Sequence, residues 1–189
     1  MRETGRPLTV DTVPALTLPT ARVGPSYTEG VREFLAEGRG GPDDHSLFRN
    51  LIREAGRPDD TPAWLERALA FERRLITDPP ADFVPSTTYW WTEGDTYLGR
   101  INLRHRLNEQ LSDIGGHIGY DVRPTARRRG HATAMLAAVL PLAADLGIDK
   151  ALITCDTENT ASRKVIEANG GVLEDERGGR LRFWVPTAP

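Results

Sequence analysis

The chain has 189 residues, of which 39% are hydrophobic and 27% are charged. These proportions are ordinary for a globular protein and allow one domain with a buried core. The net charge of −3 argues against a general nucleic-acid binder. A single cysteine, Cys155, excludes an internal disulfide and a multi-cysteine zinc site, and the four histidines lack ligand spacing, so we predict no metal site.

Segments that would target the chain to a membrane are not apparent in the sequence. No apolar run approaches the ~18 residues of a membrane span. Residues 1–12 lack the apolar core of a signal peptide. We therefore expect a cytoplasmic protein with no membrane and no nucleic acid among its partners.

The first 80 residues are predicted to be mainly helical. Residues 1–25 are expected to form a tail that leads into a short strand at 15–18. Ser26 is a candidate N-cap for a helix that runs to about residue 37. A second helix is predicted over 46–55, and a third begins at Thr61, a capping residue followed by proline. Residues 26–80 thus make a helical N-terminal part.

After residue 85 the pattern changes to strands alternating with two helices. The predicted strands cover 86–92, 97–103, 116–122, 151–155, 172–175 and 181–185, and the predicted helices cover 130–146 and 160–168. Pro141 conflicts with the first of these helices, because an interior proline costs ~3 kcal/mol. The order of elements predicts a mixed α/β (α+β) fold, with a central sheet flanked by helices, in a single domain over 1–189.

The loop at residues 123–129, between a strand and a helix, is the strongest candidate for a binding site. A helix N-terminus presents unpaired N–H groups and the positive end of its dipole, so it attracts phosphate. Gly130 allows a close backbone approach, and three arginines, Arg127, Arg128 and Arg129, add charged donors. The loop therefore predicts a diphosphate or other polyanion ligand. The alternative is a solvated arginine loop in which Gly130 merely starts a helix.

Two motifs then give a resemblance to a known family. Arg127-x-x-Gly130-x-Ala132 is similar to the [Q/R]-x-x-G-x-[G/A] signature of the GNAT superfamily of N-acetyltransferases, and it follows a strand as in that family. Asn159-x-x-Ser162, on a helix that ends in glycines, resembles the family's second motif. The resemblance covers residues 85–189 well, as a coenzyme A-binding core, and the first 80 residues loosely.

The resemblance implies a GNAT-type fold and acetyl-CoA as cosubstrate. Loop amides and the helix N-terminus would hold the pyrophosphate, and the preceding strand would pair with the pantetheine arm through Tyr120 and Val122. The backbone N–H of Tyr120 is also the candidate oxyanion donor. Asn159 would bind a pantetheine amide, a role compatible with capping its helix. The residues expected to bind the cofactor are Tyr120, Val122, Arg127, Arg128, Arg129, Gly130, His131, Ala132, Thr133, Asn159 and Ser162.

The implied reaction is direct transfer of an acetyl group to an amine in a ternary complex. His117 is the candidate base, since its reference pKa of ~6.5 suits proton uptake near neutrality; the alternative is a strand histidine hydrogen-bonded on a sheet face. Many family members have a tyrosine as the acid where this chain has Ile166. His105 is a weaker candidate base. Cys155 is more readily explained as a buried strand thiol than as a nucleophile.

The acceptor cannot be derived from the sequence. A small-molecule or peptide amine is expected, and the resemblance also allows a homodimer. Two other hypotheses stay open: a non-catalytic acyl-CoA sensor or scaffold, which the missing tyrosine would permit, and a generic polyanion binder.

Overall fold

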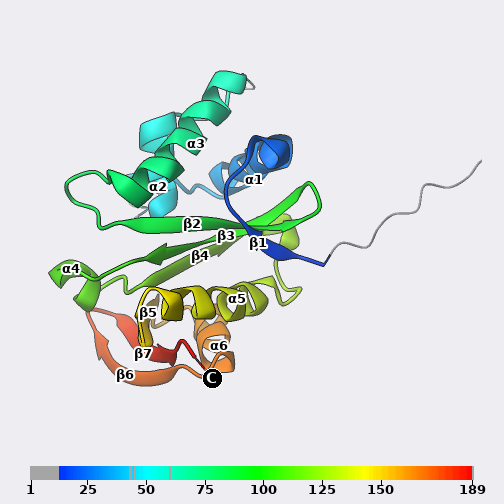
Figure 1. Ribbon diagram of the computed structural model, residues 1–189. Coiled ribbons are helices and arrows are strands. Elements are labelled where there is room, and N and C mark those ends of the chain that lie inside the picture. The colour runs from blue at the N-terminus through cyan, green and yellow to red at the C-terminus, as the bar shows by residue number, and fades with distance from the viewer. Residues whose placement is uncertain (1–12, 43, 45, 60, 189) are drawn as a thin grey trace, which may run out of the picture.

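Two antiparallel sheets form the centre of the protein (Figure 1). The computed structural model describes residues 13–42, 44, 46–59 and 61–188, so the predicted tail at 1–12 lies outside the described residues. The first sheet has the order β1-β2-β3-β4 and the second the order β5-β7-β6. The strands are β1 (Ala15–Thr17), β2 (Ser86–Glu93), β3 (Thr96–Arg104), β4 (Ile118–Val122), β5 (Lys150–Asp156), β6 (Val172–Arg177) and β7 (Arg180–Pro186).

The two sheets meet at one end of β4. Gly116 forms an isolated bridge with Ile153, and the N–H of His117 donates to the carbonyl oxygen of Leu152 at 2.7 Å. A side chain at Gly116 could not be accommodated, because its Cβ would lie 2.2 Å from the oxygen of Leu152 and its φ is +65°. The predicted central sheet is therefore present in two parts that touch here and separate further along β4.

Helices cover both faces of the first sheet. In Figure 1, α1 (Gly24–Ala36), α2 (Leu47–Ala55) and α3 (Pro62–Thr77) lie on one face, while α5 (His131–Asp145) lies on the other, towards the second sheet. The remaining helices are α6 (Thr160–Ala168), the short α4 (Glu109–Asp113) and the 3-10 turns Ala21–Val23 and Pro124–Ala126. This arrangement confirms the predicted α/β fold class. Within the described ranges, no helix is both long and apolar enough to cross a membrane.

A separate apolar cluster lies on each face of the first sheet. Under the N-terminal helices, Tyr27 stacks on Trp90 with ring centroids 4.1 Å apart. On the opposite face, the buried residues of α5, including Met135, Leu136 and Val139, pack against strands of both sheets. The first cluster fixes the N-terminal helices to the sheet, and the second fixes the N-terminal end of α5 beside β4.

Two details of the helices differ from the prediction. Ser26 is not an N-cap: α1 begins at Gly24, two residues earlier, and the Ser26 hydroxyl instead accepts the N–H of Tyr97 at 2.9 Å. Pro141 lies inside a continuous α5. It is tolerated because both Pro141 and Ala137, whose carbonyl loses its helical partner, are exposed and accessible to water.

Candidate functional site

Two cavities meet at β4. The first, of about 560 Å³, is called here the loop cavity because the 127–133 segment forms much of its wall. The second, of about 700 Å³, is called the polar cavity because arginines and aspartates from both sheets and residues before α2 line it. Residues common to both are Tyr120, Asp121, Asn159 and Ser162. The loop cavity is lined by Tyr120, Asp121, Val122, Arg127, Arg128, Gly130, His131, Ala132, Thr133, Asn159, Ala161, Ser162 and Val165.

The N-terminus of α5 presents unpaired donors to the loop cavity. Its N-cap is Gly130, in the left-handed conformation at φ 80°, and no side chain caps the helix. By contrast, Ser46, Thr61 and Asn159 each cap their own helix through a side-chain oxygen. None of the backbone N–H groups of residues 128–133 donates a hydrogen bond to another described residue. Six consecutive amides and a helix dipole are thus available to an anion.

Two carboxylates, one on α1 and one at its C-cap, fix the loop. Glu33 accepts from Arg123 at 2.6 Å and from the N–H and hydroxyl of Thr125. Although burial would raise the pKa of Glu33, these hydrogen bonds hold it below its usual value. Glu37, one helical turn further, binds both terminal nitrogens of Arg127 at 2.7 Å each. The Arg127 guanidinium therefore anchors the loop and is not free to bind phosphate.

The other two arginines of the loop keep their charge available. Arg128 and Arg129 form no ion pair with any residue that the structure describes. Arg128 also has a positive φ of 61°, which is unusual for a residue with a side chain. This backbone conformation belongs to the turn that leads into the free amides of α5.

One edge of β4 is open towards the loop cavity. At the two ends of the β3–β4 pairing, the backbone N–H of Arg104 donates to the carbonyl oxygen of His117, and that of Arg123 donates to the carbonyl oxygen of Leu98. Backbone groups in an antiparallel pair alternate in direction, so those of Tyr120 and Val122 point away from β3. β4 is the last strand of its sheet. An extended ligand could therefore pair with this edge as an added strand would.

The Tyr120 side chain lies where the two cavities join. Its hydroxyl is 2.7 Å from Oγ of Ser162, in the first turn of α6, and burial raises its pKa to about 12. Asn159 caps α6 by accepting the N–H of Ser162 at 3.0 Å, which leaves its amide nitrogen available to a ligand. Burial raises the pKa of the nearby Cys155 thiol, as expected for an inert core cysteine.

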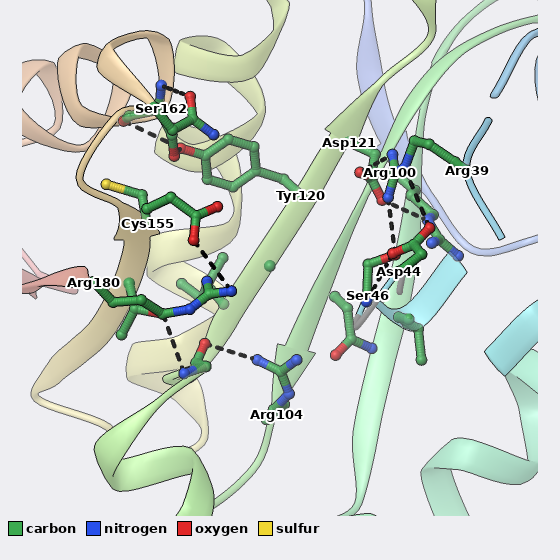
Figure 2. A pocket seen from close by; sticks show the side chains of 18 residues that line it. Arg39, Asp44, Ser46, Arg100, Arg104, Tyr120, Asp121, Cys155, Ser162 and Arg180 are labelled. Carbon is green, nitrogen blue, oxygen red and sulfur yellow. Dashed lines mark hydrogen bonds and ion pairs between the residues drawn. The ribbon is translucent and has the colours of Figure 1, made fainter. Parts of the chain in front are cut away.

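Ion pairs occupy one wall of the polar cavity (Figure 2). Asp121, on β4, pairs with Arg100 at 3.2 Å and with Arg39 at 2.5 Å. Burial alone would raise the pKa of Asp121, but the two guanidinium groups hold it below its usual range. A carboxylate so strongly paired is a poor proton acceptor.

His117 lies outside both cavities. It is only 8% exposed, and its Nδ1 accepts the N–H of Leu152 at 2.9 Å. Burial, with a contribution from Arg104, lowers its pKa to about 4. With Nδ1 occupied, a neutral ring carries its hydrogen on Nε2 and has no free lone pair. This geometry favours the alternative prediction, a strand histidine hydrogen-bonded on a sheet face. The residue directly precedes β4, and its ring accepts a hydrogen bond from β5.

His105 and Trp91 also have local partners. His105 Nε2 is 2.9 Å from the hydroxyl of Thr87, and it lines neither cavity. Trp91 donates its indole N–H to Nδ1 of His131 at 3.3 Å, which orients that ring at the start of α5. Ile166 is fully buried in the core. His105 and His117 thus line neither cavity, and Ile166, at the position of the family tyrosine, has no ionisable group.

Comparison with family models identifies the family of the chain. The chain matches the family model of the acetyltransferase (GNAT) domain over residues 43–172. The chain belongs to the GNAT acetyltransferase family. This membership confirms the resemblance seen in the sequence and makes the chain an N-acetyltransferase with acetyl-CoA as cosubstrate.

Solved GNAT structures share the fold of this acetyltransferase at low sequence identity. PaiA N-acetyltransferase of Thermoplasma acidophilum with coenzyme A has a TM-score of 0.59 at 14% identity, covering 92% of this chain and 99% of that one. The GNAT domain of S. lividans PAT has a TM-score of 0.59 at 14% identity, covering 92% of this chain and 90% of that one. RimL, a ribosomal L7/L12 alpha-N-protein acetyltransferase in complex with coenzyme A, has a TM-score of 0.58 at 15% identity, covering 97% of this chain and 98% of that one. No curated protein matches the chain at a significant level.

Sequence reasoning missed several residues of this GNAT site. Glu33 and Glu37 are four residues apart, so they share a helix face, a spacing that could have suggested a partner for the arginine loop. The role of Tyr120 was predicted for its backbone only, because the hydroxyl's partner, Ser162, is 42 residues away. The arginines of the polar cavity carry no motif, and only the fold brings them together, three from the sheets and Arg39 from the segment between α1 and α2.

Proposed function

We propose that this GNAT enzyme transfers the acetyl group of acetyl-CoA directly to an amine held in the polar cavity. The observation that carries the proposal is the meeting of the two cavities at Tyr120 and Ser162. A cofactor in the loop cavity and an acceptor in the polar cavity would bring thioester and amine together there. Such an arrangement favours a ternary complex over a covalent enzyme intermediate.

The loop cavity supports a specific placement of the cofactor. The pyrophosphate binds the free amides of residues 128–133, with Arg128 and Arg129 beside it. The pantetheine arm pairs with the open edge of β4 at Tyr120 and Val122, and Asn159 donates its amide hydrogens to it. The thioester then lies beside Tyr120, whose backbone N–H can polarise the carbonyl oxygen.

We assign the Tyr120 hydroxyl as the general acid that protonates the departing thiolate. The amine nitrogen attacks the thioester carbonyl, the C–S bond breaks, and the sulfur takes the phenolic hydrogen. The phenolate then regains a proton from water, which balances the proton that the amine loses to solvent. Ser162, at 2.7 Å, orients the hydroxyl. The phenol enters from β4, whereas the family tyrosine expected at Ile166 would come from α6.

The proton of the attacking amine leaves through the polar cavity. The geometry does not support His117 as its acceptor, since this ring lines neither cavity. Asp156 does line the polar cavity, and its side chain is 62% exposed. A water chain past this carboxylate can carry the proton to solvent.

Calorimetry and a thiol assay together test the function. Titration of acetyl-CoA should give one site per chain, and release of free coenzyme A thiol should require both acetyl-CoA and an amine from a broad panel. Binding without transfer to any amine would instead support a sensor or scaffold. Competition by pyrophosphate as strong as that by coenzyme A would support a generic polyanion binder.

A further inference from the structure

The charges that line the polar cavity are not balanced. Three of its four arginines pair with carboxylates: Arg39 and Arg100 with Asp121, and Arg180 with Asp156 at 3.3 Å. The fourth, Arg104 at the end of β3, forms no ion pair with any described residue. An arginine without a carboxylate on a cavity wall is a candidate receptor for an anion.

Arg104 is held in place by one nitrogen only. Its Nη1 donates to the carbonyl oxygens of Gly115 and Gly116, at 3.0 and 2.9 Å. Nε and Nη2 donate to no other described residue. These two nitrogens form one edge of the guanidinium, the edge that can bind a carboxylate or phosphate through two parallel hydrogen bonds. The side chain is thus fixed while its bidentate edge stays available.

A second arginine shows what a purely structural role looks like in the same protein. Arg182 is 5% exposed and uses both terminal nitrogens, Nη1 on Asp175 and Nη2 on the carbonyl oxygen of Ser112. Arg104 has no carboxylate, and its partial burial lowers its pKa to about 10, so its charge lacks compensation. An anion bound at Arg104 would supply that compensation.

The strand opposite Arg104 leaves room for a ligand. Gly119 on β4 lines the polar cavity, and a Cβ built on it would meet only Nη2 of Arg104, at 3.9 Å. Gly99, in contrast, is required by packing, since its Cβ would lie 2.5 Å from the oxygen of Asp121. The absence of a side chain at Gly119 therefore keeps space open beside the free edge of Arg104.

We propose that the acceptor is an amine that carries an anionic group, a carboxylate or a phosphate, and that Arg104 binds this group. The proposal rests on the proposed function, because it places the acceptor in the polar cavity. In Figure 2, Ser162 and Tyr120 lie together in the upper part of the view, and Arg104 lies in the lower part. The anionic end and the reacting amine of one small molecule would thus bind at different ends of the cavity.

Matched pairs of amines test the acceptor class. An amino acid is compared with its carboxamide, and an aminoalkyl phosphate with the parent amino alcohol, so the two arms distinguish carboxylate from phosphate. We expect kcat/KM to be roughly 10- to 100-fold higher for the anionic member of one pair, as for charge-assisted hydrogen bonds. Arg104→Gln should remove most of this preference without changing the affinity for acetyl-CoA. Equal rates within both pairs, or a preference that persists in Arg104→Gln, would overturn the proposal.

Two further variants control for folding and for net charge. Arg106→Gln makes the same charge change on an exposed residue outside both cavities and should leave the preference intact. Gly119→Val fills the space beside Nη2 without removing the carbonyl contacts of Arg104. If Arg104→Gln does not fold, Gly119→Val provides the test. Its preference for the anionic amine should be smaller than that of the wild type, and an unchanged preference would refute the anion site.

A binding measurement separates this proposal from the proposed function. Inorganic phosphate or acetate is titrated into protein saturated with coenzyme A, so that the loop cavity is already filled. Binding that is lost in Arg104→Gln and kept in Arg106→Gln supports the anion site even if no amine of the panel is acetylated. No binding of either anion by the saturated wild-type protein counts against the site, even if transfer to neutral amines is observed.

Discussion

Replacing Gly130 by glutamate tests the assignment of the cofactor loop. Gly130 lies within the run of free amides at residues 128–133. A Cβ at Gly130 has no atom within 4 Å, so a glutamate side chain has room there and would place its carboxylate beside the proposed pyrophosphate site. Two unit charges about 4 Å apart repel by roughly 4 kcal/mol at an effective dielectric constant near 20. This predicts a loss of acetyl-CoA affinity of about a thousandfold.

Gly130→Ala is the matched control. Both variants force a side chain into the left-handed conformation at φ 80°, at a cost of about 1–2 kcal/mol. Both should therefore lower Tm by about 2–8 °C. Only the glutamate variant should lose affinity in calorimetry with acetyl-CoA, while alanine should change it less than about tenfold. Equal losses in both would show that backbone geometry, and not electrostatics, explains the effect, and would refute the reasoning.

Three other predictions concern residues around the cavities. Tyr120→Phe should lower kcat by about 10²- to 10⁴-fold with unchanged acetyl-CoA affinity, as for loss of a general acid. An unchanged rate constant in single-turnover assays would exclude the phenol as the acid. Glu33→Gln should lower the unfolding free energy by about 1.5–3 kcal/mol. Glu37→Gln should lower it by less than about 1 kcal/mol, because its ion pair is more exposed. Urea titration measures both losses, and a larger loss for Glu37→Gln would contradict the prediction. His117 has a folded-state pKa of about 4, below the unfolded value of ~6.5, so its contribution to stability is complete above pH 6.5 and falls as pH drops towards 4, by about 2–3 kcal/mol. His117→Asn should reduce this pH dependence and leave the pH–rate profile near neutrality unchanged.

The sequence predicted the fold well because its signals were local. Every predicted strand and helix is present, since alternation, caps and glycine breaks act within a few residues. Ser26 was assigned wrongly for the same reason. Its hydroxyl binds Tyr97, 71 residues away, and a contact over that distance leaves no pattern near residue 26.

The candidate cofactor loop could be located from the sequence, whereas the proposed reacting groups could not. Gly130 and the arginines are contiguous, so the candidate anion site could be recognised as a segment. Distinguishing Arg127, bound to Glu37, from the unpaired Arg128 requires the position of α1. His117 was proposed as the base from its residue type and from its position in the resemblance, but its hydrogen bond is made to Leu152, on another strand.

The single junction between the two sheets has a thermodynamic consequence. Described backbone contacts between β4 and β5 are confined to the end near Gly116 and Ile153, and beyond it neither strand is hydrogen-bonded to the other. A cofactor that pairs with β4 and contacts α6 would bridge the two sheets where their own strands are not hydrogen-bonded. Its binding free energy then adds to the folding free energy, by about 2.7 kcal/mol at a concentration 100 times Kd. The protein with cofactor bound should therefore resist heat and proteolysis through a contact that its own chain does not provide.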